Sequence, residues 1–235
     1  MNWVARACRS SIGAKVVMAV TGAMLLLFLL AHLLGNLTLF GGPEKMNHYA
    51  QSLRDLGPLL WVARIGLLAV ALVHVFTALR LIKANESARP IAYLKQASRQ
   101  VKPQTKYMAT TGLALLAYAL FHLAHFTWGA IYPGYAPGEA KLADGRVVHD
   151  VYSMVVHGFS EWWVSAAYLA AMVCLALHLC HGVSSACQTL GLNNAKYQRA
   201  IKLAGPAVAT LFFLGYASLP IAVLLGMVAL PGGAS

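Results

Sequence analysis

Long, uninterrupted runs of apolar residues dominate the chain and alternate with short polar segments. Five of these runs are long enough to cross a bilayer as helices, which takes about 20 residues. They cover approximately residues 16–40, 59–82, 107–131, 162–188 and 204–230. Each run is continuous, rich in Leu and Ala, and far longer than the roughly 10 alternating residues of a membrane-spanning strand. The pattern predicts an all-α membrane protein, a five-helix bundle forming a single integral-membrane domain.

Basic residues precede the first apolar run, as they precede the apolar core of a secretion signal. They are Arg6, Arg9 and Lys15. The run is too long for a cleaved signal, and no cleavage site of small residues follows it. We therefore expect this segment to remain as a membrane anchor.

Composition supports a membrane protein and excludes several other classes. Hydrophobic residues make up 59% of the 235 residues and charged residues 11%, while the formal net charge is +11. Soluble globular domains have about a quarter charged residues, and one core of this size could not bury so much apolar surface. The high hydrophobicity excludes a disordered chain. The positive charges form a few short clusters rather than the broad basic surface of a nucleic-acid binder.

These clusters of charge predict the orientation of the helices. With five spans, the N-terminal segment and the loops at about 83–106 and 189–203 share one side of the membrane. Including Arg80, that side holds 13 of the 18 Lys and Arg residues and one acid, Glu86. The positive-inside rule then places the N-terminus in the cytoplasm and the chain in the cytoplasmic (inner) membrane as a multi-pass protein. The basic loops also suit contact with anionic lipid or docking of a cytoplasmic partner.

Histidines inside the apolar runs are the main candidates for function, because ionisable groups at membrane depth are costly. Six of the nine histidines lie there: His32, His74, His122, His125, His178 and His181. At a rise of about 1.5 Å per residue, His32 and His122 lie about 24 and 22 Å along outward-running helices. His74 and His178 lie about 22 and 24 Å along inward-running helices. The spacing therefore predicts one pair near the outer leaflet and a second pair near the cytoplasmic leaflet.

Opposed histidines on facing helices are what bis-histidine ligation of haem requires, with the flat macrocycle between the helices. A zinc or copper site needs three or four ligands at one depth, and no acid lies at these depths. Covalent attachment is excluded because the sequence holds no C-x-x-C-H motif. The four cysteines show no metal-binding spacing and suit packing as reduced thiols: Cys8, Cys174, Cys180 and Cys187. The pattern predicts two b-type haems.

Two of the four ligands have a competing neighbour. His125 follows His122 by three residues, so the two share a helix face. His181 follows His178 in the same way. Depth favours His122 and His178, and the neighbours are then available to bond a haem propionate or a quinone. A lone histidine between helices would instead be a neutral, hydrogen-bonded packing residue.

Short motifs occur in a characteristic order along the chain. Ser10-Ser11-Ile12-Gly13-Ala14-Lys15 precedes the first run, which carries Thr21-Gly22 and His32 with Gly35-Asn36-Leu37. Later runs carry Gly66-Leu67-Leu68 before His74, Thr110-Thr111-Gly112 before His122, and His178-Leu179-Cys180-His181-Gly182. In this order and over nearly its whole length, the chain resembles the single-chain, di-haem cytochrome b membrane anchor of succinate:quinone oxidoreductases. That family includes the quinol:fumarate reductases.

This resemblance implies that His32 and His122 bind the iron of the distal haem. It implies likewise that His74 and His178 bind the iron of the proximal haem. The soluble partners would be a flavoprotein subunit and an iron–sulfur subunit on the cytoplasmic side. The chain would be the quinone-reactive part of the complex, without a dicarboxylate site. It would carry electrons between iron–sulfur clusters and a membrane quinone, with menaquinone favoured, in succinate oxidation or in fumarate reduction.

The resemblance also implies a quinone site near the distal haem, at the outer end of the bundle. Quinone chemistry needs a proton donor or acceptor and a hydrogen-bond donor to the ring oxygens. The candidates there are Asn47, His48, Arg54, Asp55, Arg64 and Glu161. Arg64 lies within the second apolar run and could instead pair with a haem propionate or extend to the interface. His149 and His157 are expected at the solvated outer surface.

Two other functions fit parts of this pattern. A standalone transmembrane di-haem cytochrome b reductase needs the same histidines without tightly bound soluble subunits. A transporter or proton channel without haem would use the histidines as a relay. Co-purification of flavin and iron–sulfur subunits would favour the membrane anchor over the standalone cytochrome. A b-type haem spectrum would exclude the transporter or channel without haem.

Overall fold

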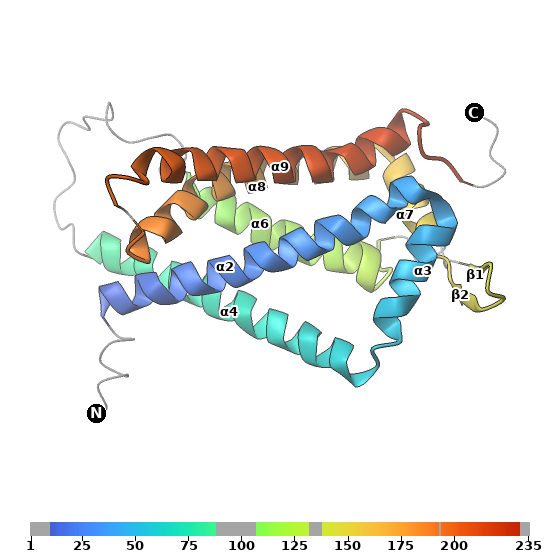
Figure 1. Ribbon diagram of the computed structural model, residues 1–235, viewed down its shortest axis with the longest axis horizontal. Coiled ribbons are helices and arrows are strands. Elements are labelled where there is room, and N and C mark those ends of the chain that lie inside the picture. The colour runs from blue at the N-terminus through green and yellow to red at the C-terminus, as the bar shows by residue number, and fades with distance from the viewer. Residues whose placement is uncertain (1–9, 88–106, 132–137, 193, 231–235) are drawn as a thin grey trace.

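The computed structural model describes residues 10–87, 107–131, 138–192 and 194–230 (Figure 1). The fold is mostly helical (81%), and five helices are long and apolar enough to cross a membrane. They are α2 (Ser11–Asn36), α4 (Pro58–Ser87), α6 (Met108–His122) continued by η3 (Leu123–Thr127), α8 (Trp162–Thr189) and α9 (Gln198–Leu224). The predicted helical architecture with five candidate spans is confirmed.

The bounds of these helices differ from the apolar runs by several residues. The side chain of Ser10 accepts a hydrogen bond from the backbone N–H of Gly13 (2.9 Å), so α2 begins at Ser11. α2 ends at Asn36 and is followed directly by the 3₁₀ helix η1 (Leu37–Gly41). α9 begins and ends six residues earlier than the apolar run at 204–230. Capping and turn chemistry, which hydropathy does not register, set these ends.

One end of the bundle carries additional structure, which we call the cap. It consists of α3 (Gly42–Arg54), the antiparallel strands β1 (Glu139–Lys141) and β2 (Val147–His149), and α7 (Val151–Ser160). Figure 1 shows these elements gathered where α2 ends and α8 begins. In the sequence, Pro133, Gly134, Pro137 and Gly138 predict turns rather than another span in the segment 132–161. Residues 132–137 lie outside the described part, and the rest forms the hairpin and α7.

The buried side chain of Asn47 on α3 hydrogen-bonds to the start of α7 inside the cap. Its side chain is only 1% exposed. The amide N–H of Asn47 donates to Asp150 Oδ1 (3.0 Å), and its carbonyl oxygen accepts from the backbone N–H of Tyr152 (2.9 Å). Asp150 also caps α7 by accepting from the backbone N–H (3.0 Å) and the hydroxyl (2.6 Å) of Ser153. The cap is therefore held by a buried polar link.

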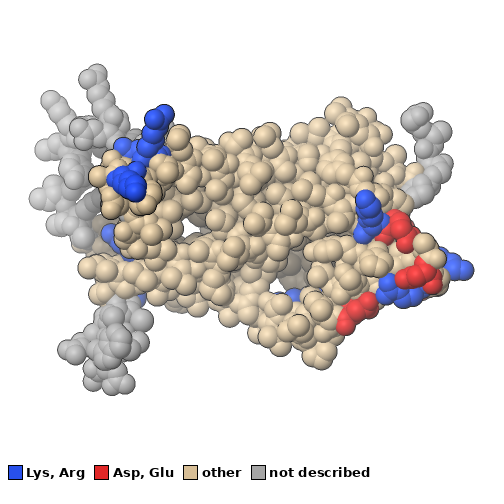
Figure 2. Space-filling view, viewed as in Figure 1, with Lys and Arg blue, Asp and Glu red and all other residues tan. Residues whose placement is uncertain are grey.

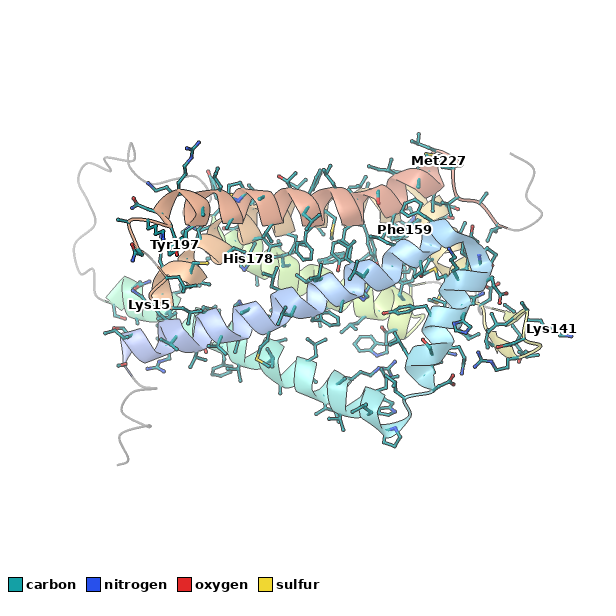
Figure 3. All side chains as sticks on the ribbon, viewed as in Figure 1. Lys15, Lys141, Phe159, His178, Tyr197 and Met227 are labelled. Atoms are coloured by element: carbon teal, nitrogen blue, oxygen red, sulfur yellow. The ribbon has the colours of Figure 1, made fainter. Side chains whose placement is uncertain are left out.

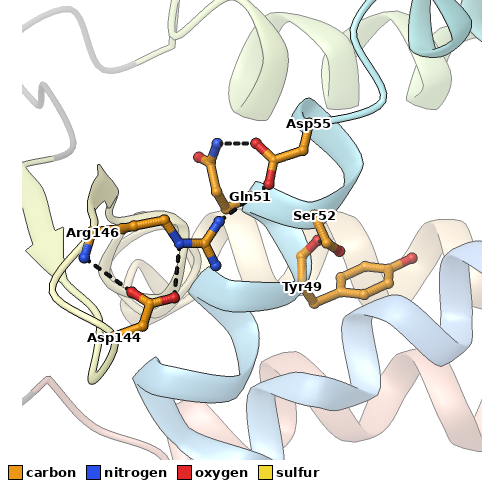
Figure 4. A network of polar contacts seen from close by, with 6 residues as sticks. All are labelled: Tyr49, Gln51, Ser52, Asp55, Asp144 and Arg146. Atoms are coloured by element: carbon orange, nitrogen blue, oxygen red, sulfur yellow. Dashed lines mark hydrogen bonds and ion pairs between the residues drawn. The ribbon is translucent and has the colours of Figure 1, made fainter.

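A second, exposed set of contacts ties the hairpin to α3 (Figure 4). Arg146 donates from Nε to Asp144 Oδ2 (2.7 Å) and from Nη1 to Asp55 Oδ2 (3.2 Å). Gln51 donates to the other oxygen of Asp55 (2.7 Å). These side chains are about half exposed, and exposed ion pairs of this kind contribute little to stability.

The packed centre of the bundle is formed by α2, α8 and α9. Toward the cap, buried side chains such as Leu39, Val156 and Val164 form one apolar cluster. A second cluster joins Leu33 of α2 to side chains of α8 and α9. A Cβ placed on Gly215 of α9 would lie 2.7 Å from Leu33, so the glycine permits this close approach.

α4 lies beside α2 and outside this packed centre (Figure 1). Its sequence is strongly apolar, yet none of its residues with a described side chain is buried. Apolar surface of this extent needs cover from something other than the polypeptide. Lipid and a large apolar ligand are both suited to cover it.

Charged side chains gather at the two ends of the molecule (Figure 2). The end opposite the cap, which we call the basic end, carries Lys15, Arg80, Lys83, Lys196, Arg199 and Lys202. At the cap, acidic and basic side chains mix. The other residues counted toward the basic side lie outside the described ranges: Arg6, Arg9, Arg89, Lys95, Arg99, Lys102 and Lys106.

Candidate functional site

The histidines predicted to act as ligands come from four different helices. They are His32 on α2, His74 on α4, His122 on α6 and His178 on α8. The rings of His32 and His122 lie next to each other in an edge-to-face arrangement, with centroids 5.8 Å apart and planes at 83°. Phe28 stacks on His32 at 5.3 Å. The structure thus brings together His32 and His122, the two histidines whose depths along their helices predicted a pair.

His74 and His178 have matching contacts closer to the basic end. Nδ1 of His74 lies 3.0 Å from Oγ1 of Thr21 on α2. Nδ1 of His178 lies 3.3 Å from Oγ1 of Thr111 on α6. Figure 3 places His178 toward the basic end, away from the cap.

A glycine follows each of these threonines and gives the imidazole room. A Cβ on Gly22 would lie 3.3 Å from Cε1 of His74. A Cβ on Gly112 would lie 3.4 Å from Cε1 of His178. Each ring therefore rests against the backbone of the neighbouring helix, and a side chain at either glycine would press on it.

His125 has surroundings different from those of His122, although it follows by only three residues. η3 is a π-helical turn, so the chain leaves the regular α-helical face just after His122. His125 is 6% exposed, and a Cβ on Gly158 of α7 would lie 2.9 Å from its ring. Its ring is thus packed into the cap, whereas His122 faces His32.

Tyr168 of α8 links the two neighbouring histidines. Its hydroxyl lies 3.1 Å from Nδ1 of His122 and 3.1 Å from Nδ1 of His125. A hydroxyl has one hydrogen, so it donates to one ring and accepts from the other. Tyr168 is 5% exposed and packs edge-on against Tyr118 and Phe159. The aromatic cluster keeps water from this side of the histidine pair.

His181 and the cysteines form no obvious metal cluster. His181 is half-buried on α8, one turn beyond His178. Cys174, Cys180 and Cys187 are half-buried and not disulfide-bonded, while Cys8 lies outside the described residues. Over the described ranges, no group of three or more His, Cys, Asp and Glu side chains gathers to hold a metal ion.

A cavity of about 750 Å³ opens beside the cap end of α4. It is lined by Arg54, Gly57, Pro58, Leu60, Trp61, Arg64 and Thr127. The guanidinium of Arg64 lies over the ring of Trp61, 5.1 Å from its centroid. The guanidinium groups of Arg54 and Arg64 and the apolar lining residues suit a largely apolar ligand that carries a negatively polarised oxygen.

The other candidates for a quinone site lie elsewhere in the cap. Asn47 is buried between α3 and α7, and Asp55 bonds to the hairpin. His48 is exposed and lines a separate cavity of about 340 Å³. Glu161 directly precedes α8. Arg54 and Arg64 thus line one cavity, and none of these four residues is among its lining side chains.

The two remaining histidines lie in the cap and are half-buried rather than fully solvated. His157 is on α7 and His149 ends β2. Burial lowers the pKa of His149, and the nearby positive charge of Arg54 lowers it further, although Asp150 opposes both.

These features define a multi-pass helical membrane protein with histidines paired between its helices. No protein-family model, curated protein or solved structure matches the chain.

Proposed function

We propose that this protein is a di-haem cytochrome b that anchors a succinate:quinone oxidoreductase or quinol:fumarate reductase in the membrane. It passes electrons between the iron–sulfur subunit of that complex and a membrane quinone. The observation that carries the proposal is the paired arrangement of four histidines, each on a different helix. One pair faces across the bundle, and the other is held by two equivalent threonine contacts.

The dimensions of the His32–His122 pair support haem binding. A metal–imidazole bond is about 2.0–2.1 Å long, so rings bound to opposite sides of one ion have centroids about 6 Å apart. The separation of 5.8 Å agrees with that value. α4, which carries His74, has no buried residue among those described and leaves apolar surface that a porphyrin would cover.

Bound haem would supply reversible one-electron transfer. The chain would hold the group with His32, His122, His74 and His178, and the contacts to Nδ1 of the last three would orient their rings. His125 is a weaker candidate ligand, because its ring is packed against α7. His181 remains the alternate to His178 on α8.

The cavity beside α4 supports a quinone site near the distal pair. Thr127, which lines it, lies in the turn that directly follows His122. Arg54 or Arg64 would donate a hydrogen bond to a quinone oxygen, and Trp61 would pack along the ring. Menaquinone is the favoured quinone. Asn47, His48, Asp55 and Glu161 do not line this cavity. Of the six candidates, only Arg54 and Arg64 are therefore proposed to bind the quinone.

Charge supports the orientation of the complex. The basic end would face the cytoplasm and would dock the flavoprotein and iron–sulfur subunits. The cap would then face outward. The arrangement supports electron transfer in either direction, for succinate oxidation or for fumarate reduction.

The deciding experiment is a reduced-minus-oxidised haem spectrum of the purified chain and two of its variants. We expect two b-type haems per wild-type chain, with flavin and iron–sulfur subunits co-purifying. His122→Ala should lose one haem, and the matched His125→Ala should keep both. A colourless wild-type protein would overturn the proposal in favour of a histidine relay. Two haems with consistent absence of soluble subunits would favour a standalone cytochrome.

A further inference from the structure

Two helices of the bundle carry the same polar pattern at the same spacing. Thr21-Gly22 lies on α2 and Thr111-Gly112 lies on α6. His32 follows Thr21 by 11 residues, and His122 follows Thr111 by 11 residues. Because His32 and His122 face each other, both Thr-Gly pairs lie about 16 Å further toward the basic end, at a common level.

Each threonine contacts the histidine of the next long helix in the chain. Thr21 on α2 reaches His74 on α4, and Thr111 on α6 reaches His178 on α8. In both cases the ring atom is Nδ1, and in both cases the adjacent glycine faces Cε1 of the ring. The α2–α4 pair and the α6–α8 pair therefore present their histidines in the same way.

The hydrogen of each threonine hydroxyl is already used within its own helix. Oγ1 of Thr21 donates to the carbonyl oxygen of Val17 (2.7 Å), and Oγ1 of Thr111 donates to that of Tyr107 (2.9 Å). A carbonyl oxygen can only accept, and a hydroxyl has a single hydrogen. With that hydrogen on the carbonyl oxygen, only lone pairs of Oγ1 are left for the imidazole, so Nδ1 of each histidine carries a hydrogen and donates it.

We propose that Thr21 and Thr111 are paired positioning residues that hold His74 and His178 as their Nδ1–H tautomers. A neutral imidazole protonated at Nδ1 has an unprotonated Nε2. Both histidines thereby present Nε2, the ligating nitrogen, to one metal. That this metal is the iron of the proximal haem rests on the proposed function, whereas the tautomers are a property of the chain alone.

The hydrogen bonds also tune the bound group. A ligand histidine that donates its second N–H to an acceptor is better oriented and more basic, and losing such a partner typically costs about 10–100-fold in metal affinity. A more basic ligand stabilises the oxidised iron. The two hydroxyls should therefore hold the midpoint potential of the proximal haem low and leave that of the distal haem unchanged.

The first test is a potentiometric titration of both haems in the full complex, with low-spin haem signals followed by electron paramagnetic resonance. Thr21→Val and Thr111→Val keep the shape of the side chain and remove the hydroxyl acceptor, while the backbone of Met18, which also hydrogen-bonds His74, stays in place in Thr21→Val. Each is expected to raise the midpoint potential of the same haem and to weaken its retention. Thr21→Ser and Thr111→Ser keep the hydroxyl and should behave as wild type.

Thr77→Val is the matched control. Thr77 lies one turn from His74 on α4 and donates only to the carbonyl oxygen of Val73 (2.7 Å) in the described contacts. Its variant should leave both potentials unchanged. Valine variants that titrate like wild type would overturn the proposal. Loss of the haem from the serine variants would also overturn it, because serine keeps the acceptor.

The second test reads the tautomers directly, by nitrogen NMR of the full chain prepared without haem. Nδ1 of His74 and His178 should be protonated and Nε2 unprotonated, and each valine variant should redistribute the tautomers of its own partner. Protonated Nε2 in the wild type would refute the positioning role even if haem binds. The expected tautomers in a wild-type chain that takes up no haem would support it and refute the proposed function.

Discussion

Hydroxyl groups within the bundle serve two different purposes. Those of Tyr216 and Ser165 donate to backbone carbonyl oxygens, at 2.7 Å from Leu29 and 2.6 Å from Phe159. They satisfy buried polar atoms, which would otherwise cost about 1–3 kcal/mol each. Those of Thr21 and Thr111 also donate to backbone carbonyl oxygens, but they contact histidine rings as well, and so does that of Tyr168. Hydroxyls of the second kind orient candidate ligands, so their loss should alter spectra and potentials as well as stability.

The two glycines beside the threonines give a prediction about packing. In Gly22→Ala and Gly112→Ala, the new methyl group would lie 3.3 and 3.4 Å from the adjacent imidazole, so the ring must shift by a few tenths of an ångström. We expect a lower ratio of proximal haem to protein in both variants, measured by pigment extraction against protein concentration.

Gly66→Ala on α4 is the control for these variants. A Cβ there meets no atom within 4 Å, and alanine is better than glycine within a helix by about 0.5–1 kcal/mol. This variant should keep both haems and melt at the same or a higher temperature. Full haem content in all three variants would show that ring packing at the glycines does not limit binding.

The sequence identified the histidines but not their partners. An imidazole inside an apolar run stands out because of its position alone, so His32, His74, His122 and His178 could be named and paired by depth. The contact of Tyr168 with His122 joins residues 46 positions apart, and no periodicity within one helix encodes it. The choice between His122 and His125 depends on a π-helical turn that hydropathy does not reveal.

At the scale of elements, apolar runs predicted how many long helices form and missed what connects them. α3 and α7, of 13 and 10 residues, are too short to be counted as spans, and the glycines and prolines at 132–161 indicated turns before α8. Their positions depend on Asn47, a buried side chain that bonds residues more than 100 positions away. Such links depend on the tertiary fold and cannot be read from local pattern.

The cap should lose stability in acid because of Asp150. Burial alone would raise the pKa of this carboxyl, but hydrogen bonds donated by Ser153 and Asn47 outweigh it and hold the pKa below its ordinary value of 3.8. A depressed pKa in the folded state means stabilisation that is present above pH 3.8 and lost as the pH falls through the folded value. Asp150→Ala should therefore destabilise the protein by about 1 kcal/mol at pH 6, as expected for a lost N-cap.

Thermal unfolding in detergent, followed by circular dichroism at pH 6 and at successively lower pH, measures this effect. The gap in melting temperature between wild type and Asp150→Ala should narrow below pH 3.8. Asp144→Ala is the control, since Asp144 is exposed and pairs with Arg146 on the surface. If the difference in melting temperature between wild type and Asp150→Ala stayed constant across the pH series, the carboxylate of Asp150 would not stabilise the cap.

At the scale of the whole molecule, the chain is a bundle whose charge is separated along its length (Figure 2). Five spans place the cap and the basic end on opposite sides of a membrane, and the histidine pairs lie at two levels between them. Under the proposed function, electrons would pass along these two levels from one face of the membrane to the other. The composition, apolar yet strongly basic, predicted that charge would be concentrated outside the spans. That the described side chains of α4 are left unburied is seen only in the fold.

The orientation of this bundle gives a prediction that needs neither haem nor partner. In a chain whose four cysteines are replaced by alanine, single cysteines at Ala143 in the hairpin and at Asn194 before α9 report the two ends, and both positions are exposed. The excess of Lys and Arg at the basic end should retain that end in the cytoplasm. A membrane-impermeant maleimide added to intact cells whose outer barrier is opened should label Ala143→Cys fully. Asn194→Cys should react only after the cytoplasmic membrane is permeabilised. The reverse result would place the basic end outside, where it could not dock a cytoplasmic iron–sulfur subunit.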